Sequence, residues 1–502
     1  QNHFDGFFVG AQIRCEAALV ADSRGIASLF EHASQVVEDF DPHAQRFAER
    51  RGAERQDHEL LQIHRIVGMG AAIQDVHHRN GEQGGIRHGG ITGQVPIQRQ
   101  TQRCGRGPGR GHRDSQQRVR PQFGFVGCAV QLQQTTVHRA LILAQDARSI
   151  RIHGAGTIEA PGEAYVEGML EEMGTYIPSR HRPRTLVIDR CKNVHIEGIK
   201  IGLSAMWTVH LISSEDVVLE GISIINDRKM PNTDGVVVDA CCRVSITDCV
   251  IDTADDGVVL KTSRGGDGAP IGECREIRVR GCKIISESCA LKLGTESFAD
   301  MTEILFEDCE IAHSNRALGL FSRDGGRLAN VTFRRLKLEC RETPEGFWGS
   351  GEAITATALD RRGTQAAGII ENVLFEDIDG LMEGAINLYA DRPGMIRNVT
   401  LRRVDIRQQP GRFNACRYDV RPTKFDLAPS PDAAGRANAW VRGEDGKVIG
   451  LMPYPGGMPG VFASNVENLL LEDVNVSRPD PLPAGFHPEP IVILQDQTSV
   501  WS

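Results

Sequence analysis

Aromatic residues are scarce in this sequence, at only 5% of its 502 residues. It has no apolar run of about 18 residues, which excludes a membrane-spanning helix. An excess of basic residues is also lacking, because the net charge is −9, and this gives no support to a nucleic-acid-binding protein. The 13 cysteines are an odd number in a long chain and do not favour a disulfide framework. Glycine is plentiful, at 54 residues, and together with short valine and isoleucine runs it favours stacked β-strands over a helical enzyme.

Residues 1–139 differ from the rest of the chain. They contain no lysine, tyrosine or tryptophan, since the first of each is Lys192, Tyr165 and Trp207, yet they hold ten of the 16 histidines. Three interpretations stay open for this His/Arg/Gln-rich segment: a disordered polar extension, a divergent domain, or a stretch translated out of frame. We therefore expect two parts, this atypical segment and one elongated domain over residues 140–502 with a loop insertion near 407–464.

The N-terminal segment offers no functional site of its own. His77 and His78 are adjacent, but no cysteine or carboxylate lies around them at the spacing of metal ligands. Gln1 is not followed by a charged stretch and an apolar core, so no signal peptide is visible and the cellular location stays unknown. The segment also shows no evident cap for the first coil of a stacked fold.

From about residue 140 the sequence repeats one phrase. Polar residues are followed by alternating valine and isoleucine, then by glycine, aspartate or cysteine, and then by an apolar pair, as in Cys191–Ile201, Glu215–Ile225 and Cys274–Ile284. The phrases begin about 23 to 33 residues apart, which is too short for a propeller blade of about 40 residues. Leucine-rich-repeat patterns and helical stretches are absent. The sequence therefore predicts an all-β solenoid, in which stacked coils bury a continuous apolar row.

Three cysteines fall at the same place in successive phrases. Cys249, Cys282 and Cys309 should form a column along the solenoid. We interpret this column as a buried packing ladder of small apolar side chains, in preference to disulfides or a metal site.

A second set of strands lies between the phrases and can be aligned by its period of two. Its inward positions are valine, leucine and isoleucine. One of the outward columns reads Asp234, Asp256, Cys289, Arg316, Glu352 and Gly384. Another reads Val237, Val259, Lys292, Gly319, Thr355 and Asn387.

Asp234, Asp255 and Asp256 thus fall on two adjacent coils. Three carboxylates so close repel one another, and one of them should have a raised pKa. Aspartate before glycine is also good turn chemistry, but two such motifs in register on neighbouring coils favour a function. Paired carboxylates across a sugar bond are the machinery of glycoside hydrolysis. The spacing alone leaves both retention and inversion of the anomeric carbon open.

Several motifs resemble those of the family 28 glycoside hydrolases, the polygalacturonase group. Residues 231–235 (PNTDG), followed by residues 254–257 (ADDG), are similar to the active-site motifs of that family, and residues 182–184, 191–194 and 206–210 resemble its lead-in coils. The similarity extends over roughly residues 140–476. It implies a right-handed parallel β-helix that hydrolyses α-linked galacturonosyl bonds of pectin with inversion and without a metal.

The resemblance also implies roles for single residues. Asp255 would be the general acid, Asp234 and Asp256 would hold and activate the water, and Asn232 would support the site. Residues 294–297 (GTES), with Glu296, are similar to a segment of exo-acting members and indicate attack from a chain end.

Two departures concern the substrate. The family's Gly-His-Gly segment falls on residues 287–290 (ESCA), which include Cys289. Its Arg-Ile-Lys segment, which binds the substrate carboxylate, falls on residues 319–321 (GLF), and both cations are lost. Lys292 and Arg316 on the same stripe could compensate, since arginine binds a carboxylate with two parallel hydrogen bonds. The substrate could also be a modified uronide or another glycan.

Some interpretations stay open beside the hydrolase. A β-helix lyase of the pectate-lyase type would use Ca²⁺, and a glycan-binding β-helix would not be catalytic. Trp207 and Trp348 could stack on sugars or pack within loops, whereas His210 reads as structural. For the hydrolase we expect a monomer that acts on a pectic polysaccharide or oligosaccharide, with no cofactor and no nucleic-acid partner, and the resemblance suggests an extracellular or periplasmic location.

Overall fold

The structure, a computed structural model, describes residues 72–74 and 140–495, apart from 172, 180, 345–346, 362–364, 414 and 426–440. The atypical N-terminal segment therefore lies outside the described residues except for a short strand, β1 (Ala72–Gln74). This strand pairs antiparallel with β3 of the first coil.

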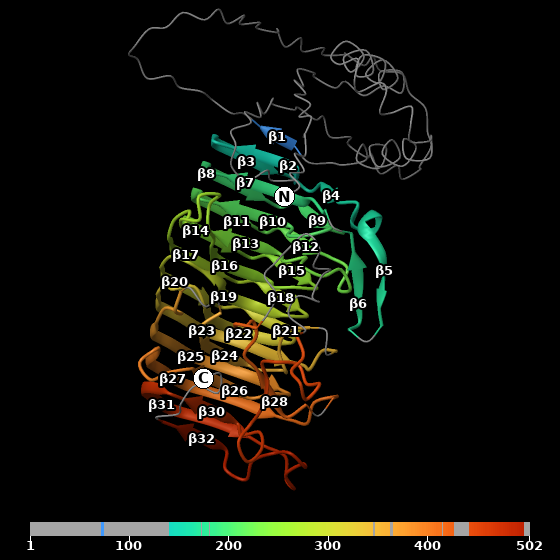
Figure 1. Cartoon of the computed structure of the whole chain (residues 1–502). Coiled ribbons are helices and arrows are strands. Elements are labelled where there is room, and N and C mark those ends of the chain that lie inside the picture. Colours follow the sequence, from blue (N-terminus) through green and yellow to red (C-terminus); the bar gives the residue numbers. More distant parts are fainter. Residues whose placement is uncertain are drawn as a thin grey trace, which may run out of the picture.

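The described chain winds into a right-handed parallel β-helix, as the sequence predicts (Figure 1). One wall is a sheet of 17 strands, in which two parallel stacks of short strands merge into four long ones. Its members are β1, β3 (Arg148–His153), β4 (Thr157–Glu159), β8 (Lys192–Glu197), β9 (Lys200–Gly202), β11 (Glu215–Glu220), β12 (Ser223–Ile225), β14 (Cys242–Thr247), β15 (Val250–Thr253), β17 (Cys274–Arg280), β18 (Lys283–Ser286), β20 (Met301–Glu307), β21 (Glu310–Ser314), β23 (Leu328–Cys340), β25 (Ile370–Met382), β27 (Ile396–Gln408) and β31 (Val466–Ser477).

The opposite wall is a sheet of 11 parallel strands, one from each coil. Its members are β2 (Ala140–Gln145), β7 (Arg184–Asp189), β10 (Val209–Ile212), β13 (Val236–Asp239), β16 (Val258–Thr262), β19 (Cys289–Ser297), β22 (Arg316–Ser322), β24 (Ile354–Ala358), β26 (Ile386–Ala390), β30 (Val461–Ser464) and β32 (Ile491–Leu494).

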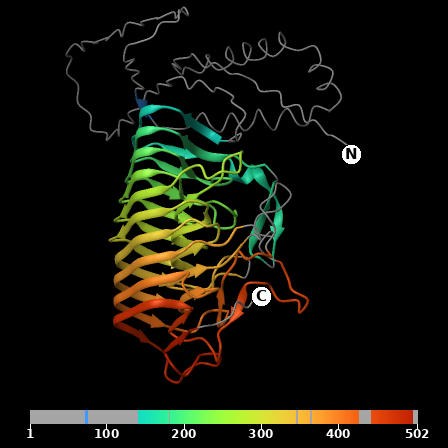
Figure 2. The same ribbon diagram turned by 60° about the vertical axis from the view of Figure 1, so that its left-hand side comes forward.

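Two antiparallel hairpins project from the coils on the same side of the molecule (Figure 2). The first is formed by β5 (Val166–Leu170) and β6 (Thr175–Pro178) and follows a short 3-10 helix, η1 (Gly162–Tyr165). The second is formed by β28 (Arg417–Asp419) and β29 (Leu451–Pro453) and belongs to the predicted insertion.

The core is the space between the two walls. It is filled by the inward valine, leucine and isoleucine residues of both sheets. The predicted cysteine ladder is confirmed, because Cys249, Cys282 and Cys309 are buried, free of disulfides and in mutual contact. Farther along, Phe306, Phe333 and Phe375 stack with ring centroids 4.7 and 5.1 Å apart. Stacking identical side chains at the spacing of neighbouring strands keeps the core dry and continuous.

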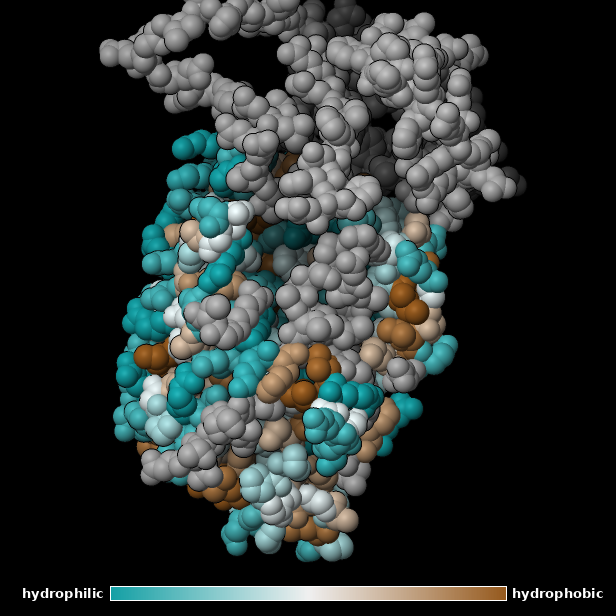
Figure 3. All heavy atoms as spheres, in the orientation of Figure 1, coloured by the Kyte–Doolittle hydropathy of each residue, from teal (hydrophilic) through white to brown (hydrophobic). Residues whose placement is uncertain are grey.

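The polar residues that open each phrase have a structural role. A polar residue near the start of the phrase takes a left-handed conformation, as Asn330 (φ 56°), Asn372 (φ 55°) and Asn398 (φ 54°) do, and asparagine tolerates this conformation better than most residues. Their amides form a ladder, since Asn372 donates to Asn330 at 3.1 Å and Asn398 donates to Asn372 at 3.0 Å. The corners of the coils are thus polar, and the edge near β8, β14, β17 and β20 is mostly hydrophilic (Figure 3).

Candidate active site

The strand register confirms both predicted columns. Val236 pairs with Val258, Val258 with Leu291, and Leu291 with Leu318, so Asp234, Asp256, Cys289 and Arg316 follow one another along the solenoid. The outward column on the same strands runs through Val237, Val259, Lys292, Gly319, Thr355 and Asn387. His210 precedes Val237 in that column. The three aspartates therefore lie on adjacent coils, at the turns that lead into β13 and β16.

The glycine after each aspartate motif is required by the close stacking of coils. A Cβ on Gly235 would lie 2.5 Å from the carbonyl oxygen of Gly257, and a Cβ on Gly257 would lie 2.6 Å from that of Ala290. Hydroxyls fix the turn itself, because Thr253 and Ser286 each donate to the Asp255 carbonyl at 2.7 Å. The sequence pattern Asp-Gly is thus both a turn signal and a packing requirement.

Asp256 is the most firmly held of the three carboxylates. The Lys292 Nζ lies 2.7 Å from its Oδ2, and the Ser288 hydroxyl donates to its Oδ1 at 3.0 Å. Its own backbone N–H donates to the Asp255 carboxylate at 3.1 Å. Asp256 is only 2% exposed. Both oxygens of this buried carboxylate therefore accept hydrogen bonds, one of them from a cation.

Asp234 carries the raised pKa that the sequence predicts for one of the three. Burial raises the pKa of Asp234 well above its usual range, and the neighbouring Asp255 raises it further. The Lys261 ammonium lies 4.0 Å from its carboxylate. The raised pKa in this cluster thus belongs to Asp234, whereas the resemblance gives the acid role to Asp255.

Lys261, which is buried, and Glu296, which is partly exposed, form a second ion pair beside Asp234. The Lys261 Nζ lies 2.9 Å from the Glu296 Oε2, and Arg361 approaches the other Glu296 oxygen at 3.4 Å. Burial would raise the pKa of Glu296, but Lys261 and Arg361 outweigh it and hold that pKa well below its usual range. Burial likewise lowers the pKa of Lys261, but Glu296 and Asp234 reverse the effect and leave it raised. Glu296 is therefore a fixed anion at the site.

Asn232 is held by an arginine that the sequence analysis did not place in the site. Arg182 donates to the Asn232 side-chain oxygen at 2.9 Å and to the carbonyls of Pro231 and Ala205 at 2.6 and 2.9 Å. Burial lowers the pKa of Arg182 to about 10, and Asp255 and Asp234 oppose that shift. Asn232 itself has a φ of 63°. Arg182 thus fixes the strained turn that presents Asp234.

Arg316 and Cys289 lie deeper than the sequence suggests. Arg316 is 2% exposed, and its guanidinium lies 3.1 Å from the Asp419 carboxylate and 3.5 Å from that of Glu352. Cys289 is buried, and its thiol donates to the Leu291 carbonyl at 3.5 Å. Both residues therefore lie in the predicted column and are engaged within the protein.

The insertion packs over the outer face of the 11-stranded sheet at its C-terminal end. Tyr418 and Tyr454 from the insertion form an apolar cluster with Tyr389 and Phe462 of the sheet, with ring centroids 4.9 to 5.7 Å apart. Asp419 on β28 reaches back to Arg316, and Arg421 also binds Asp419, at 2.9 Å. These contacts hold the insertion against the coils next to the site.

Trp207 and Trp348 lie in different surroundings. Trp207 is half-buried beside the aspartates, with Arg184 and Lys261 at 4.8 and 4.6 Å from its ring. His210 meets it edge-on at 4.8 Å, is buried, and lies 3.5 Å from Asp239, which agrees with a structural role. Trp348 lies beneath Arg421 at 5.0 Å, beside the insertion.

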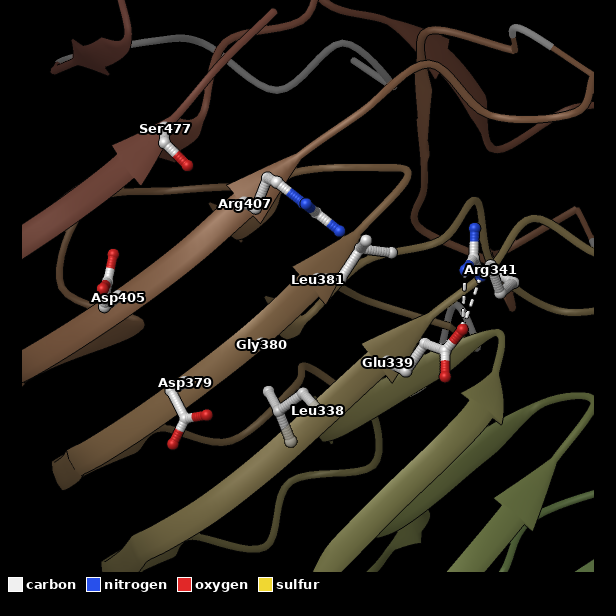
Figure 4. Close-up of a pocket in the computed structure, with 9 residues that line it drawn as sticks. All are labelled: Leu338, Glu339, Arg341, Asp379, Gly380, Leu381, Asp405, Arg407 and Ser477. Carbon is white, nitrogen blue, oxygen red and sulfur yellow. Dashed lines mark hydrogen bonds and ion pairs between the residues drawn. The ribbon is translucent and has the colours of Figure 1, made fainter.

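A surface pocket of about 630 Å³ lies on later coils than the aspartates. Figure 4 shows its side chains on β23, β25, β27 and β31, with Leu381 between Glu339 and Arg407, and Asp379 and Asp405 to one side. It is a shallow, charged depression on the other wall of the solenoid. The catalytic candidates do not line it.

The structure also bears on a metal site and on a membrane-spanning helix. In the described part of the chain no cluster of three or more histidine, cysteine, aspartate or glutamate side chains is arranged to hold a metal ion. Within the same ranges, a helix with the length and hydrophobicity of a membrane span does not occur.

Stacked parallel coils with a carboxylate cluster on one wall define a protein of the parallel β-helix class. The family model described as "Glycosyl hydrolases family 28" matches residues 122–418, and the chain belongs to this family.

Among known proteins, this chain is similar in sequence to polygalacturonases. A probable polygalacturonase of Arabidopsis thaliana is 30% identical over 247 residues, which are 48% of this chain and 49% of that protein. A probable polygalacturonase of Vitis vinifera is 24% identical over 39% of this chain and 40% of that protein. Among solved structures, an exopolygalacturonase from Thermotoga maritima is similar with a TM-score of 0.39 and 24% identity, over 46% of this chain and 51% of that one. The chain spans about half the length of the curated relatives it matches.

Proposed function

We propose that the chain is a glycoside hydrolase that cleaves α-linked galacturonosyl or related bonds of pectic polysaccharides. The single observation that carries this proposal is the cluster of Asp234, Asp255 and Asp256, in which burial raises the pKa of Asp234 while the Lys292 ammonium lies 2.7 Å from Asp256. Hydrolysis of a glycosidic bond needs a protonated and an ionised carboxyl group at once, one to protonate the leaving oxygen and one to activate water. Membership of family 28 supports the same reaction class.

We assign the two roles as follows. Asp256, held by Lys292 and Ser288, is the base that orients and deprotonates the water. Asp255 is the acid that passes a proton to the leaving oxygen, and Asp234, whose pKa is raised, lies beside it. Asn232 and Glu296 are placed to accept hydrogen bonds from sugar hydroxyls, and inversion of the anomeric carbon follows if the water attacks directly.

Action from a chain end fits the insertion, because it covers the outer face of the 11-stranded sheet just beyond the site. The test is product analysis on a panel of pectic oligosaccharides of defined length. The proposal expects saturated products released from one end, with the opposite anomeric configuration in NMR spectra taken during the reaction. Unsaturated products that depend on Ca²⁺ would assign the site to a lyase.

A further inference from the structure

The basic side chains around the three aspartates already have partners. Three of them are ion-paired: Lys292 binds Asp256 at 2.7 Å, Lys261 binds Glu296 at 2.9 Å, and Arg316 lies 3.1 Å from Asp419. Each of these cations is buried. A buried cation that is bound to a carboxylate of the protein cannot pair with a carboxylate of the substrate without leaving a buried charge unpaired, which is costly.

Two arginines on the N-terminal side are also committed. Arg182 donates to the carbonyls of Pro231 and Ala205 and to Asn232. Arg184 lies over the Trp207 ring, and Asp239 is its strongest charged neighbour. Both arginines therefore support the turn and the ring beside the site.

The wall on the next coil offers neither a cation nor room for one. The outward residues of β22 at this height are Gly319 and Phe321. A Cβ on Gly319 would lie 2.5 Å from the Phe321 ring and 2.7 Å from the Cys289 sulfur. Phe321 is buried, and its ring is faced by Lys292 and Arg316 at 5.3 and 5.1 Å.

The carboxyl groups of the site outnumber the cations that contact them. Asp234, Asp255, Asp256 and Glu296 are four carboxyl groups, against which Lys261, Lys292 and Arg361 are the cations in contact, and Arg361 is itself bound to Asp324 at 2.7 Å. Sugar hydroxyls can donate hydrogen bonds to such groups. A sugar carboxylate would instead add a like charge to a buried anionic cluster.

We propose that the sugar unit bound between the three aspartates and Glu296 is uncharged. This inference rests on the proposed hydrolase function and narrows its substrate to a glycosyl unit without a free carboxylate, such as an esterified uronide or a neutral sugar of a pectic chain. The fixed anion Glu296 and its partner Lys261 set this selectivity.

The experiment compares three oligosaccharides of one length: oligogalacturonide, its methyl ester, and its carboxyl-reduced form. The wild-type chain is expected to cleave at least one neutral form with a kcat/KM about tenfold or more above that of the acidic form, the scale set by one unfavourable buried charge. A preference for the acidic form overturns the inference and leaves the proposed function intact. Failure to cleave all three, with wild type and Asp255→Asn alike, overturns the proposed function itself.

A pair of variants tests the cause of the selectivity. Glu296→Gln keeps the shape and frees Lys261, so the acidic-to-neutral ratio of kcat/KM should rise about fivefold or more. Asp379→Asn in the remote pocket removes the same charge and should leave that ratio unchanged. An unchanged ratio in Glu296→Gln, or an equal rise in Asp379→Asn, contradicts the inference.

Discussion

The Lys292 Nζ lies 2.7 Å from the Asp256 Oδ2, and both side chains are buried between adjacent coils. Lys292 is on β19 and Asp256 is at the turn before β16, so the contact crosses from one coil to the next. This pair distinguishes Asp256, which is bound to a cation, from Asp234, whose pKa is raised by burial and by Asp255. The proposed reaction depends on that difference.

Replacing Lys292 by methionine should therefore damage catalysis more than binding. Without the cation, the ionised form of the buried Asp256 is disfavoured, so kcat should fall about a hundredfold and the acidic limb of the pH–rate profile should move to higher pH. Breaking one side of a buried pair should also cost about 3 to 5 kcal/mol of unfolding free energy. Kinetics over a pH series and urea unfolding measure these effects.

The matched variants separate the two effects. Lys292→Arg should retain most of the activity, because it keeps the charge. The double variant Lys292→Met with Asp256→Asn should recover much of the lost stability and none of the activity. A Lys292→Met protein with the wild-type pH–rate profile would show that the charge of Lys292 has no role in catalysis and that the side chain contributes only packing.

Asp234→Asn should lose activity and become more stable relative to wild type as the pH rises. Because burial and Asp255 raise the pKa of folded Asp234, the folded protein keeps a proton that the unfolded chain releases above about pH 4. The contribution of Asp234 to stability is therefore lost as the pH rises from there through the folded pKa. Asp234→Asn should be inactive, yet its melting temperature relative to wild type should increase between pH 4 and pH 7. A constant difference across that range would contradict the raised pKa.

The Arg316–Asp419 contact should hold the insertion on the coils. Asp419→Ala removes the carboxylate that pairs with the buried Arg316 and Arg421. We expect the free energy of unfolding to fall by about 3 to 5 kcal/mol. Arg421 and Arg316 outweigh burial and hold the pKa of Asp419 well below its usual range, so this stability is lost as the pH falls below about 4. Thermal melting reports the loss, and Asp445→Ala, which removes an exposed partner of Lys447, is the control expected to change little.

Gly257→Ala should disrupt the spacing of coils at the site. The added Cβ would lie 2.6 Å from the Ala290 carbonyl oxygen and 2.5 Å from the Ile284 side chain. We expect a loss of stability of about 1 to 3 kcal/mol and a larger loss of kcat, because the aspartates move apart. Gly168→Ala in the β5–β6 hairpin, where the nearest atom is 3.4 Å away, is the matched control. Equal melting temperatures and rates for the two variants would contradict this role of Gly257.

Much of the fold and half of the site follow from local patterns. Alternation with a period of two places Asp234, Asp256, Cys289 and Arg316 in one column, because parallel strands in neighbouring coils keep a fixed register. The cysteine ladder follows from the same rule. The expectation that one aspartate has a raised pKa needs only their proximity.

The charge partners of the site could not be predicted in this way. Asp419 reaches Arg316 from an insertion about a hundred residues away, and Arg361 reaches Glu296 from another loop. Lys261 could have been noticed, because it is polar at the end of a strand whose other residues are apolar. Arg182 could have been noticed only as one of two arginines before a buried strand. Contacts between loops leave no periodic trace in a sequence.

The most direct test of the account compares wild type and Asp255→Asn on the same pectic oligosaccharides, with release of new reducing ends as the measurement. Asparagine keeps the size of the side chain and its hydrogen bond from the Asp256 amide, but it cannot deliver a proton. The account predicts that the variant folds with the melting profile of wild type and that its rate falls about a thousandfold. A variant that cleaves as fast as wild type would contradict the assignment of this site to glycoside hydrolysis.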